Sequence, residues 1–392
     1  MTNDVFIAAA RRTPIGAFQG VFAGATAPQL GAAAAAAAIA DAGVDPERID
    51  EVIFGCVLPA GLGQAPARQA ALAAGVPARV PATTVNKMCG SGMKAAMLGY
   101  DQIRAGSASV VLAGGLESMT NAPYLLPKAR SGLRMGHSEI LDHMFYDGLQ
   151  SPFDGQLMGC FAEATSGKYG FTREQQDVFA AESVRRALAA LETGVFTRET
   201  APVTVKGRKG DTVVEKDETP YTCSIEKIPT LRPAFAKDGT VTAASSSSIS
   251  DGAAALVLAS GAAIERHGMT PLARVLGATS FAQAPEWFTT APVGAIRSLL
   301  ERVDWNAQDV DLYEVNEAFA CVAMAAMHDI GIGHEKLNVN GGACALGHPV
   351  GATGARIITT LVHALHARGG RRGIAALCIG GGEATAFAVE RV

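Results

Sequence analysis

Residues 89–96 read CGSGMKAA and residues 348–355 read HPVGATGA, and these two stretches decide the fold. Sliding one onto the other aligns Gly92 with Gly351. Both combine a reactive residue type at the first position with small residues and glycines that open a helix. A segment that recurs once in this way is typical of an internal repeat.

The segments around the two stretches also follow the same order. A short apolar strand precedes each stretch, ending at Gly55 in one place and covering residues 311–315 in the other. After each stretch come a helix, a strand and a pair of glycines, at 114–115 and at 380–381. The sequence therefore predicts an α/β protein made of two similar halves, each a mixed sheet covered by helices.

We divide the chain of 392 residues into three parts on this basis. Residues 1–120 form an N-terminal half, and residues 249–392 a C-terminal half whose repeated portion spans about 262–392. Residues 121–248 form an inserted loop domain. The length agrees with two or three domains of about 150 residues each.

Short apolar runs alternate with Ala-rich stretches along both halves. Strands are expected at residues 5–10, 51–56, 109–113, 311–315 and 374–379. Helices are expected at residues 29–42, 92–105, 174–192, 293–303 and 351–368. Gly43 and Gly369 stand where glycine ends a helix.

Composition narrows the possible partners and surroundings. The formal net charge of −4 favours neither nucleic acid nor an anionic membrane. The longest apolar block, residues 31–40, is about half of what a membrane span needs. Seven cysteines without a C-x-x-C pair favour neither a disulfide framework nor a zinc site. Because two arginines follow the first apolar run instead of preceding it, a signal peptide is not expected, and we expect a cytoplasmic protein.

Cys89 lies on a Gly-rich turn that leads into an apolar helix. Free N–H groups and the dipole at a helix N-terminus favour a thiolate, and backbone N–H groups there can hold an oxyanion. The repeat puts His348 at the matching turn of the other half, so the two side chains are expected to face each other. A cysteine with a nearby base is the usual arrangement for covalent acyl transfer. The alternatives are a structural cysteine and a histidine that is satisfied within a loop.

Two other cysteines also bear on the site. Cys378 ends an apolar strand before three glycines, where it is either a second acid/base thiol or a buried core cysteine. Cys344 lies close to His348 in the sequence, and spacing alone leaves it open as a rival nucleophile.

The motifs resemble those of the thiolases, in particular the biosynthetic acetoacetyl-CoA thiolases. The resemblance covers essentially the whole chain, and its specificity comes from an ordered set of motifs. These are RTPIG (12–16), NKMCGSG (86–92), AGGLESM (113–119), LRPAF (231–235), NEAFA (316–320), NGGA (340–343), GHP (347–349) and CIGGG (378–382).

This resemblance implies a role for each candidate residue of the reaction. Cys89 would be the acylated nucleophile, and His348 would activate it. Cys378 would deprotonate the second acetyl-CoA or protonate the leaving one. Asn316 would hold a water that forms one oxyanion hole with His348 Nε2, and the N–H groups of Cys89 and Gly380 would form the other.

The same resemblance implies binding residues and partners. Coenzyme A and acetyl-CoA would be substrates, with no permanently bound cofactor and no metal. The subunits would form a homotetramer, a dimer of dimers, with tetramer contacts in residues 121–145. The expected substrate-binding residues are Ser247, Met158, Ala318, Phe319, Phe235, Ala243 and Leu149. Arg208, Lys209 and Lys227 either meet the CoA phosphates or form a solvated basic face.

The sequence departs from the family pattern at two places near the site. Leu157 stands where many acetoacetyl-CoA thiolases have histidine, and Ala384 stands where a glycine is usual.

The function expected from this resemblance is that of an acetyl-CoA C-acetyltransferase. Two alternatives remain within the superfamily: a 3-oxoacyl-CoA thiolase with a broader range of chain lengths, and a ketoacyl synthase. A third alternative is a noncatalytic protein that binds acyl-CoA or lipid, although such a role needs none of the three reactive residues.

Overall fold

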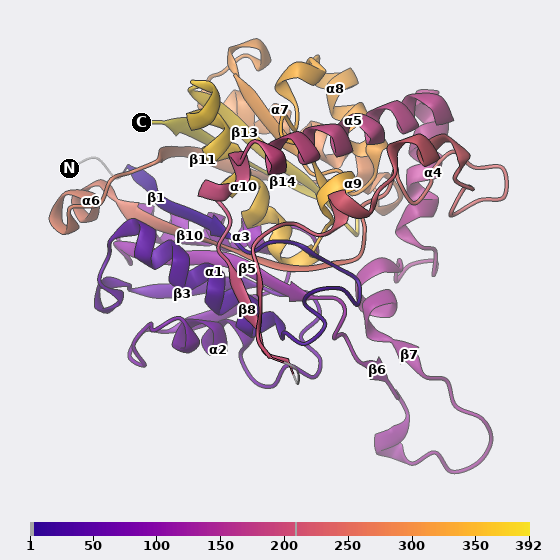
Figure 1. Ribbon diagram of the computed structural model, residues 1–392, viewed down its shortest axis with the longest axis horizontal. Helices are drawn as coiled ribbons and strands as arrows, with labels where there is room; N and C mark the ends of the chain where they lie inside the picture. Colours follow the sequence, from indigo (N-terminus) through magenta and orange to yellow (C-terminus); the bar gives the residue numbers. More distant parts are fainter. Residues whose placement is uncertain (1–3, 208–209) are drawn as a thin grey trace.

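A mixed sheet forms the frame of the molecule, for which the computed structural model describes residues 4–207 and 210–392 (Figure 1). The strand order is β12-β13-β14-β11-β1-β10-β5-β3-β4, and a short β2 pairs with β10. The strands are β1 (Val5–Arg12), β2 (Gly16–Ala17), β3 (Glu51–Gly55), β4 (Ala82–Val85), β5 (Val110–Ser118), β10 (Ser250–Ser260), β11 (Ala273–Ala282), β12 (Leu312–Val315), β13 (Arg372–Ile379) and β14 (Glu383–Arg391).

The strands fall into two groups with the same arrangement. In one group β3 runs parallel to β5, β10 pairs antiparallel with β5, and β1 pairs antiparallel with β10. In the other, β12 runs parallel to β13, β14 pairs antiparallel with β13, and β11 pairs antiparallel with β14. The groups meet where β1 pairs with β11. The two similar halves that the sequence predicts are therefore confirmed.

Helices cover both groups and also lie between them. The cluster of buried side chains around α3 and α10 includes residues of both strand groups, so these helices form the middle layer. α1 and α2 pack on the outer side of the first group, and α7 and α8 on the outer side of the second. The helices are α1 (Ala27–Ala42), α2 (Pro66–Ala73), α3 (Ser91–Ala105), α6 (Gly261–His267), α7 (Ala291–Val303), α8 (Ala320–Ile330), α9 (Ala343–Leu346) and α10 (Val350–Arg368).

The two middle helices approach each other closely at their N-termini. A methyl group at Gly92 would lie 2.9 Å from the Ala355 nitrogen and 3.0 Å from the Gly351 oxygen. Real Cβ atoms do not approach backbone so closely without displacement, so Gly92 permits this contact. The contact brings the turns before the two helices together, and these turns carry Cys89 and His348.

The expected helices and strands are all present, with ends that shift by a few residues. Gly43 and Gly369 have φ values of 62° and 71°, as expected for glycines that end helices. One part of the repeat alignment is wrong. The strand expected at 109–113 continues to Ser118, so the glycine pair 114–115 lies inside β5, whereas Gly380 follows the end of β13.

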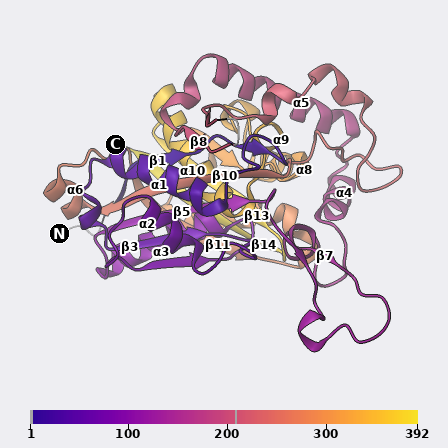
Figure 2. The ribbon, with the colours of Figure 1, turned by 60° about the horizontal axis from the view of Figure 1, so that its bottom comes forward.

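The inserted segment holds more regular structure than the expected loop domain. It contains β6 (Tyr124–Leu125), β7 (Leu141–Asp142), a π-helix (Met144–Leu149), α4 (Met158–Tyr169), α5 (Arg173–Glu192), β8 (Val203–Val205) and β9 (Thr212–Val214). The chain between β6 and β7 projects away from the rest of the molecule in both ribbon views (Figures 1 and 2). β10 lies between β1 and β5. β10 therefore belongs to the first of the two strand groups.

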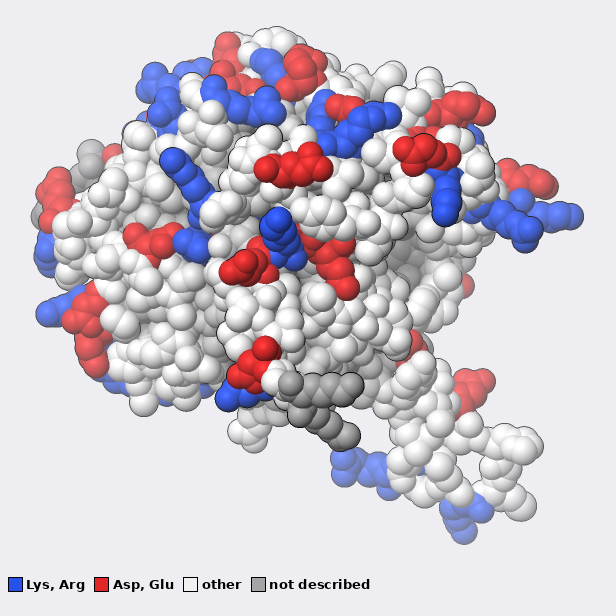
Figure 3. All heavy atoms as spheres, in the orientation of Figure 1, with Lys and Arg blue, Asp and Glu red and all other residues white. Residues whose placement is uncertain are grey.

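Neither sign of charge dominates the face of the molecule shown in Figure 3. Basic and acidic side chains are interspersed on the face shown in Figure 3, and the projecting segment carries several basic ones. Within the described part of the chain, no helix combines the length and the apolar character that crossing a membrane requires.

Candidate active site

A cavity of about 380 Å³ opens where the turns before α3 and α10 meet. Ten of the twelve residues expected at the site line it, while Cys378 and Asn316 do not. The lining residues are Cys89, Met119, Phe145, Gly148, Leu149, Leu157, Met158, Gly159, Ala234, Phe235, Ala243, Ser246, Ser247, Ser248, Ile249, Phe288, Ala318, Phe319, His348, Val350 and Gly380. Cys89 and His348 thus line one cavity, as the sequence repeat predicts.

A tight turn between β4 and α3 presents Cys89 to this cavity. Met88 has a φ of 46°, which is uncommon for a residue with a side chain. Ser91 holds the turn, because its Oγ accepts a hydrogen bond from the Lys87 nitrogen (2.8 Å) and donates one to the Met88 oxygen (2.6 Å). The Cys89 side chain is half-buried, so a substrate can reach its Sγ.

Two opposing effects set the protonation of Cys89. Burial raises the pKa of its thiol to about 11, whereas the N–H groups of Gly380 and of Cys89 itself oppose that rise. The thiol is therefore protonated at rest and needs a base. Both N–H groups lie beside the sulfur, where they stabilise negative charge on the thiolate.

His348 is held so that one ring nitrogen is free. Its Nδ1 lies 2.6 Å from Thr353 Oγ, and that hydroxyl donates a hydrogen bond to the Pro349 oxygen at 2.9 Å. Because the hydroxyl has a single hydrogen, it must accept from Nδ1–H, which leaves a lone pair on Nε2. The buried Nε2 has no partner among the described residues. Burial, and after it the charge of Arg356, lowers the pKa of His348 to about 3, so the imidazole is neutral and can accept a proton.

Cys378 and Asn316 do not line the cavity, but each lies two residues before one that does, Gly380 and Ala318 respectively. Cys378 is fully buried at the end of β13, two residues before Gly380. Burial, followed by the nearby Cys89, raises the pKa of its thiol well above the usual range, which keeps the thiol protonated at rest. Asn316 follows β12 and is also buried, and both polar atoms of its side chain lack a partner among the described residues. An unpaired buried amide is suited to holding a water molecule.

Sequence reasoning missed the role of Glu117 in supporting the site. Its buried carboxylate accepts hydrogen bonds from the nitrogens of Val57 (2.9 Å), Leu58 (3.1 Å) and Gly351 (2.9 Å). It therefore joins the loop after β3 to the first turn of α10. Burial raises the pKa of Glu117 to about 7, although the three N–H donors favour the charged form. The AGGLESM motif could have drawn attention to Glu117, but a motif does not show which groups a side chain binds.

The cavity lining beyond the reactive residues is largely apolar. The rings of Phe235 and Phe319 meet edge to face with centroids 5.9 Å apart, and a methyl group at Gly159 would clash with the Phe235 ring. Phe145 and Phe288 also line the cavity and were not among the expected residues. Leu157, noted only as a departure from the family pattern, lies in this wall too.

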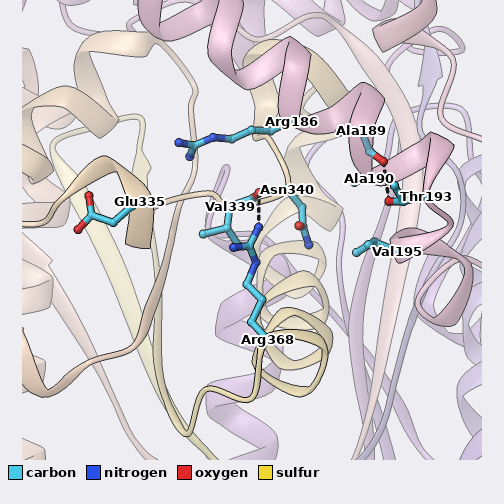
Figure 4. A pocket seen from close by; sticks show the side chains of 9 residues that line it. All are labelled: Arg186, Ala189, Ala190, Thr193, Val195, Glu335, Val339, Asn340 and Arg368. Atoms are coloured by element: carbon cyan, nitrogen blue, oxygen red, sulfur yellow. Dashed lines mark hydrogen bonds between the residues drawn. The ribbon is translucent and has the colours of Figure 1, made fainter.

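Another cavity, of about 370 Å³, has a lining without cysteine or histidine (Figure 4). Arg186 Nη1 donates to the backbone oxygen of Leu337, and Arg368 Nη2 donates to that of Val339. These arginines thus bind backbone oxygens of the segment 337–339, and the lining of this cavity offers neither a thiol nor an imidazole for acyl transfer.

Comparison with known proteins places the chain in a family. The family models "Thiolase, N-terminal domain" and "Thiolase, C-terminal domain" match residues 5–262 and 269–391. The chain belongs to the thiolase family. It is 48% identical over 391 residues to "Acetyl-CoA acetyltransferase" of Pseudomonas aeruginosa, covering 99% of this chain and 100% of that protein. It is 49% identical to "Acetyl-CoA acetyltransferase 2" of Arabidopsis thaliana, covering 99% and 97%.

A solved thiolase structure confirms the fold. The crystal structure of the Bacillus anthracis acetyl-CoA acetyltransferase matches with a TM-score of 0.97 and 42% identity, over 99% of each chain. The predicted family and fold class are therefore confirmed. Of the basic residues expected near CoA, Lys227 is exposed and outside the cavity lining, while Arg208 and Lys209 lie outside the described residues.

The contact between Thr353 and His348 yields a test of the site. We expect Thr353→Val to lower kcat in a thiolase assay by about tenfold or more, because the imidazole loses the acceptor that fixes its tautomer. Thr359→Val is the matched control, since Thr359 also bonds a carbonyl of α10 (Ala355, 3.0 Å) but is remote from the imidazole hydrogen bond. Equal kcat in both variants would contradict a positioning role for Thr353.

Proposed function

We propose that the protein is an acetyl-CoA C-acetyltransferase, which condenses two acetyl-CoA to acetoacetyl-CoA and CoA and catalyses the reverse thiolysis. One observation carries the proposal: Cys89, a neutral His348 and the Gly380 N–H group meet at one cavity. The names of the relatives described above, which align over almost their whole length, support it as well.

In the thiolysis direction, His348 begins the reaction. Its Nε2 takes the proton of Cys89, and the thiolate attacks the 3-oxo carbon of acetoacetyl-CoA. The N–H groups of Cys89 and Gly380 hold the oxyanion that forms. The carbon–carbon bond then breaks, leaving acetyl-Cys89 and the enolate of acetyl-CoA.

Cys378 and His348 complete the cycle. The enolate oxygen is held by the Nε2–H of protonated His348 and by a water on Asn316, while the Cys378 thiol protonates the enolate carbon. The raised pKa of Cys378 means that the thiol still carries its proton when the enolate forms, as this role requires. Incoming CoA then gives its thiol proton to Cys378 and attacks acetyl-Cys89, and the departing Cys89 thiolate regains its proton from His348. Every group returns to its starting state.

The other expected residues form the binding surface in this proposal. Ser247, Ala243 and Leu149 would contact the pantetheine arm of CoA, and Met158, Ala318, Phe319 and Phe235 would enclose the acyl group. Phe235 packs against Phe319 and Gly159, and these rings in the cavity wall would favour a short acyl group. Coenzyme A enters only as a substrate.

The test of this function is CoA-dependent cleavage of acetoacetyl-CoA, 3-oxohexanoyl-CoA and 3-oxodecanoyl-CoA, followed by absorbance. We expect acetoacetyl-CoA to be cleaved with a kcat/KM at least about tenfold above that of either longer substrate, because even a single methylene that does not fit an apolar pocket changes discrimination by about 10- to 200-fold.

Other outcomes would change the assignment. Equal or better cleavage of the longer substrates would replace it with a 3-oxoacyl-CoA thiolase of broader range. If none of the three were cleaved, the protein would bind acyl-CoA without turnover.

We further propose that four copies assemble in the cytoplasm through the segment of residues 121–145. Its apolar side chains are unusually exposed, since Tyr124, Met135 and Ile140 are 69%, 95% and 65% exposed. Exposed apolar side chains on a projecting segment are typical of a contact between subunits.

The free cysteines support the proposed location in the cytoplasm. All seven cysteines are free, which suits a reducing compartment.

The assembly is tested by light scattering on a sizing column. We expect the double variant Met135→Glu with Ile140→Glu to elute as dimers, because each buried carboxylate would remain without a partner. Val178→Glu is the matched control, since Val178 is also an exposed apolar residue (68%) but lies on α5. Tetramers of the double variant would rule out this segment as the contact.

A further inference from the structure

The two N–H groups that face the Cys89 sulfur come from loops far apart in the sequence. One is the turn of residues 86–90 before α3, and the other is the hairpin turn of residues 379–383 between β13 and β14. An oxyanion hole works only if its donors stay at a fixed separation, because each must lie about 3 Å from the same developing charge. The fold must therefore hold these two loops together.

Within the described chain, no backbone hydrogen bond joins the two loops. One contact between them is apolar: a methyl group at Gly90 would lie 2.4 Å from Ile379 Cδ1, so the two residues are tightly packed. The other contact is an ion pair between Lys87 Nζ and Glu383 Oε2. Lys87 precedes Cys89 by two residues, and Glu383 follows Gly380 by three.

Both ends of this ion pair are anchored in their own loops. The Lys87 nitrogen donates to Ser91 Oγ (2.8 Å), and its oxygen accepts from the Gly90 nitrogen (3.0 Å). Glu383 pairs with Ile379 at the base of the hairpin turn. A change in the separation of the two side chains is therefore transmitted to the backbone that carries the two N–H donors.

We propose that Lys87 and Glu383 are positioning residues, and that their ion pair sets the separation of the Cys89 and Gly380 N–H groups. The inference rests on the proposed function for its effect on catalysis, but its effect on the Cys89 thiol does not require any substrate. An exposed ion pair contributes little to global stability, and the Lys87 and Glu383 side chains are 24% and 38% exposed. Its effect should therefore appear at the site and leave the melting temperature unchanged.

The experiment measures alkylation of Cys89 by iodoacetamide as a function of pH, read from the peptide that contains Cys89. It compares the wild type with Lys87→Met, Glu383→Gln, the double variant and the charge swap Lys87→Glu with Glu383→Lys. We expect each single variant to lower the alkylation rate at pH 8 by about 3- to 10-fold, because the thiolate loses stabilising N–H groups. We expect kcat to fall by a similar factor with little change in KM.

The double variant and the charge swap distinguish two residues that act together as an ion pair from two residues that act independently. The double variant should lose no more than either single variant, and the charge swap should recover most of the alkylation rate. Arg79→Met is the matched control, because Arg79 also forms a surface ion pair (with Glu47, 3.0 Å) but lies outside the cavity, and it should behave as wild type.

Unchanged alkylation in the single variants, or additive losses in the double variant, would overturn the proposal. Failure of the proposed function would look different from failure of this proposal. A wild type that cleaves no 3-oxoacyl-CoA could still show alkylation rates that are coupled between Lys87 and Glu383.

Discussion

The close contact between the N-termini of α3 and α10 is the constraint on which the site depends. Gly92 lies against the backbone of Gly351 and Ala355, with no room for a side chain. The two turns that precede these helices are therefore brought to one place, and each contributes one reactive residue. Neither half of the molecule contains a nucleophile with its base. The site exists because two similar halves pack with their middle helices in contact.

Desolvation gives the reactive groups their protonation states. Burial raises the pKa of the Cys89 and Cys378 thiols and lowers that of His348, so the resting site holds neutral acids and a neutral base. A buried site cannot tolerate isolated charges, so charge appears only when a substrate and the N–H donors are in place. Buried hydrogen bonds from Thr353 and Glu117 then hold the histidine and the first turn of α10 in a fixed geometry.

The elements and the core of the site could be predicted from the sequence because they depend on local signals. Glycines at helix ends, apolar periodicity and the repeated Gly-rich turn each act within a few residues. The repeat also predicted correctly that Cys89 and His348 would share a cavity. Motif resemblance added Gly380 and seven of the other eighteen residues that line the cavity.

The features of the fold and the site that could not be predicted depend on contacts between residues far apart in the sequence, and such contacts leave no local signal. The sequence of β10 is mostly a continuous apolar run. Such a run does not indicate which strands it pairs with, so its place between β1 and β5 could not be predicted. The glycine pair 114–115 looked like the counterpart of 380–381, but it serves packing inside β5. Glu117 and the Lys87–Glu383 pair likewise gain their roles from partners far along the chain.

The central claim is that Cys89 carries the acyl group, and peptide mass spectrometry after a brief incubation with acetyl-CoA tests it most directly. The account predicts acetylation of the peptide that contains Cys89, retained in Cys378→Ser and absent in Cys89→Ser. Acetylation of Cys378 or Cys344 instead, or of no cysteine at all, would contradict it.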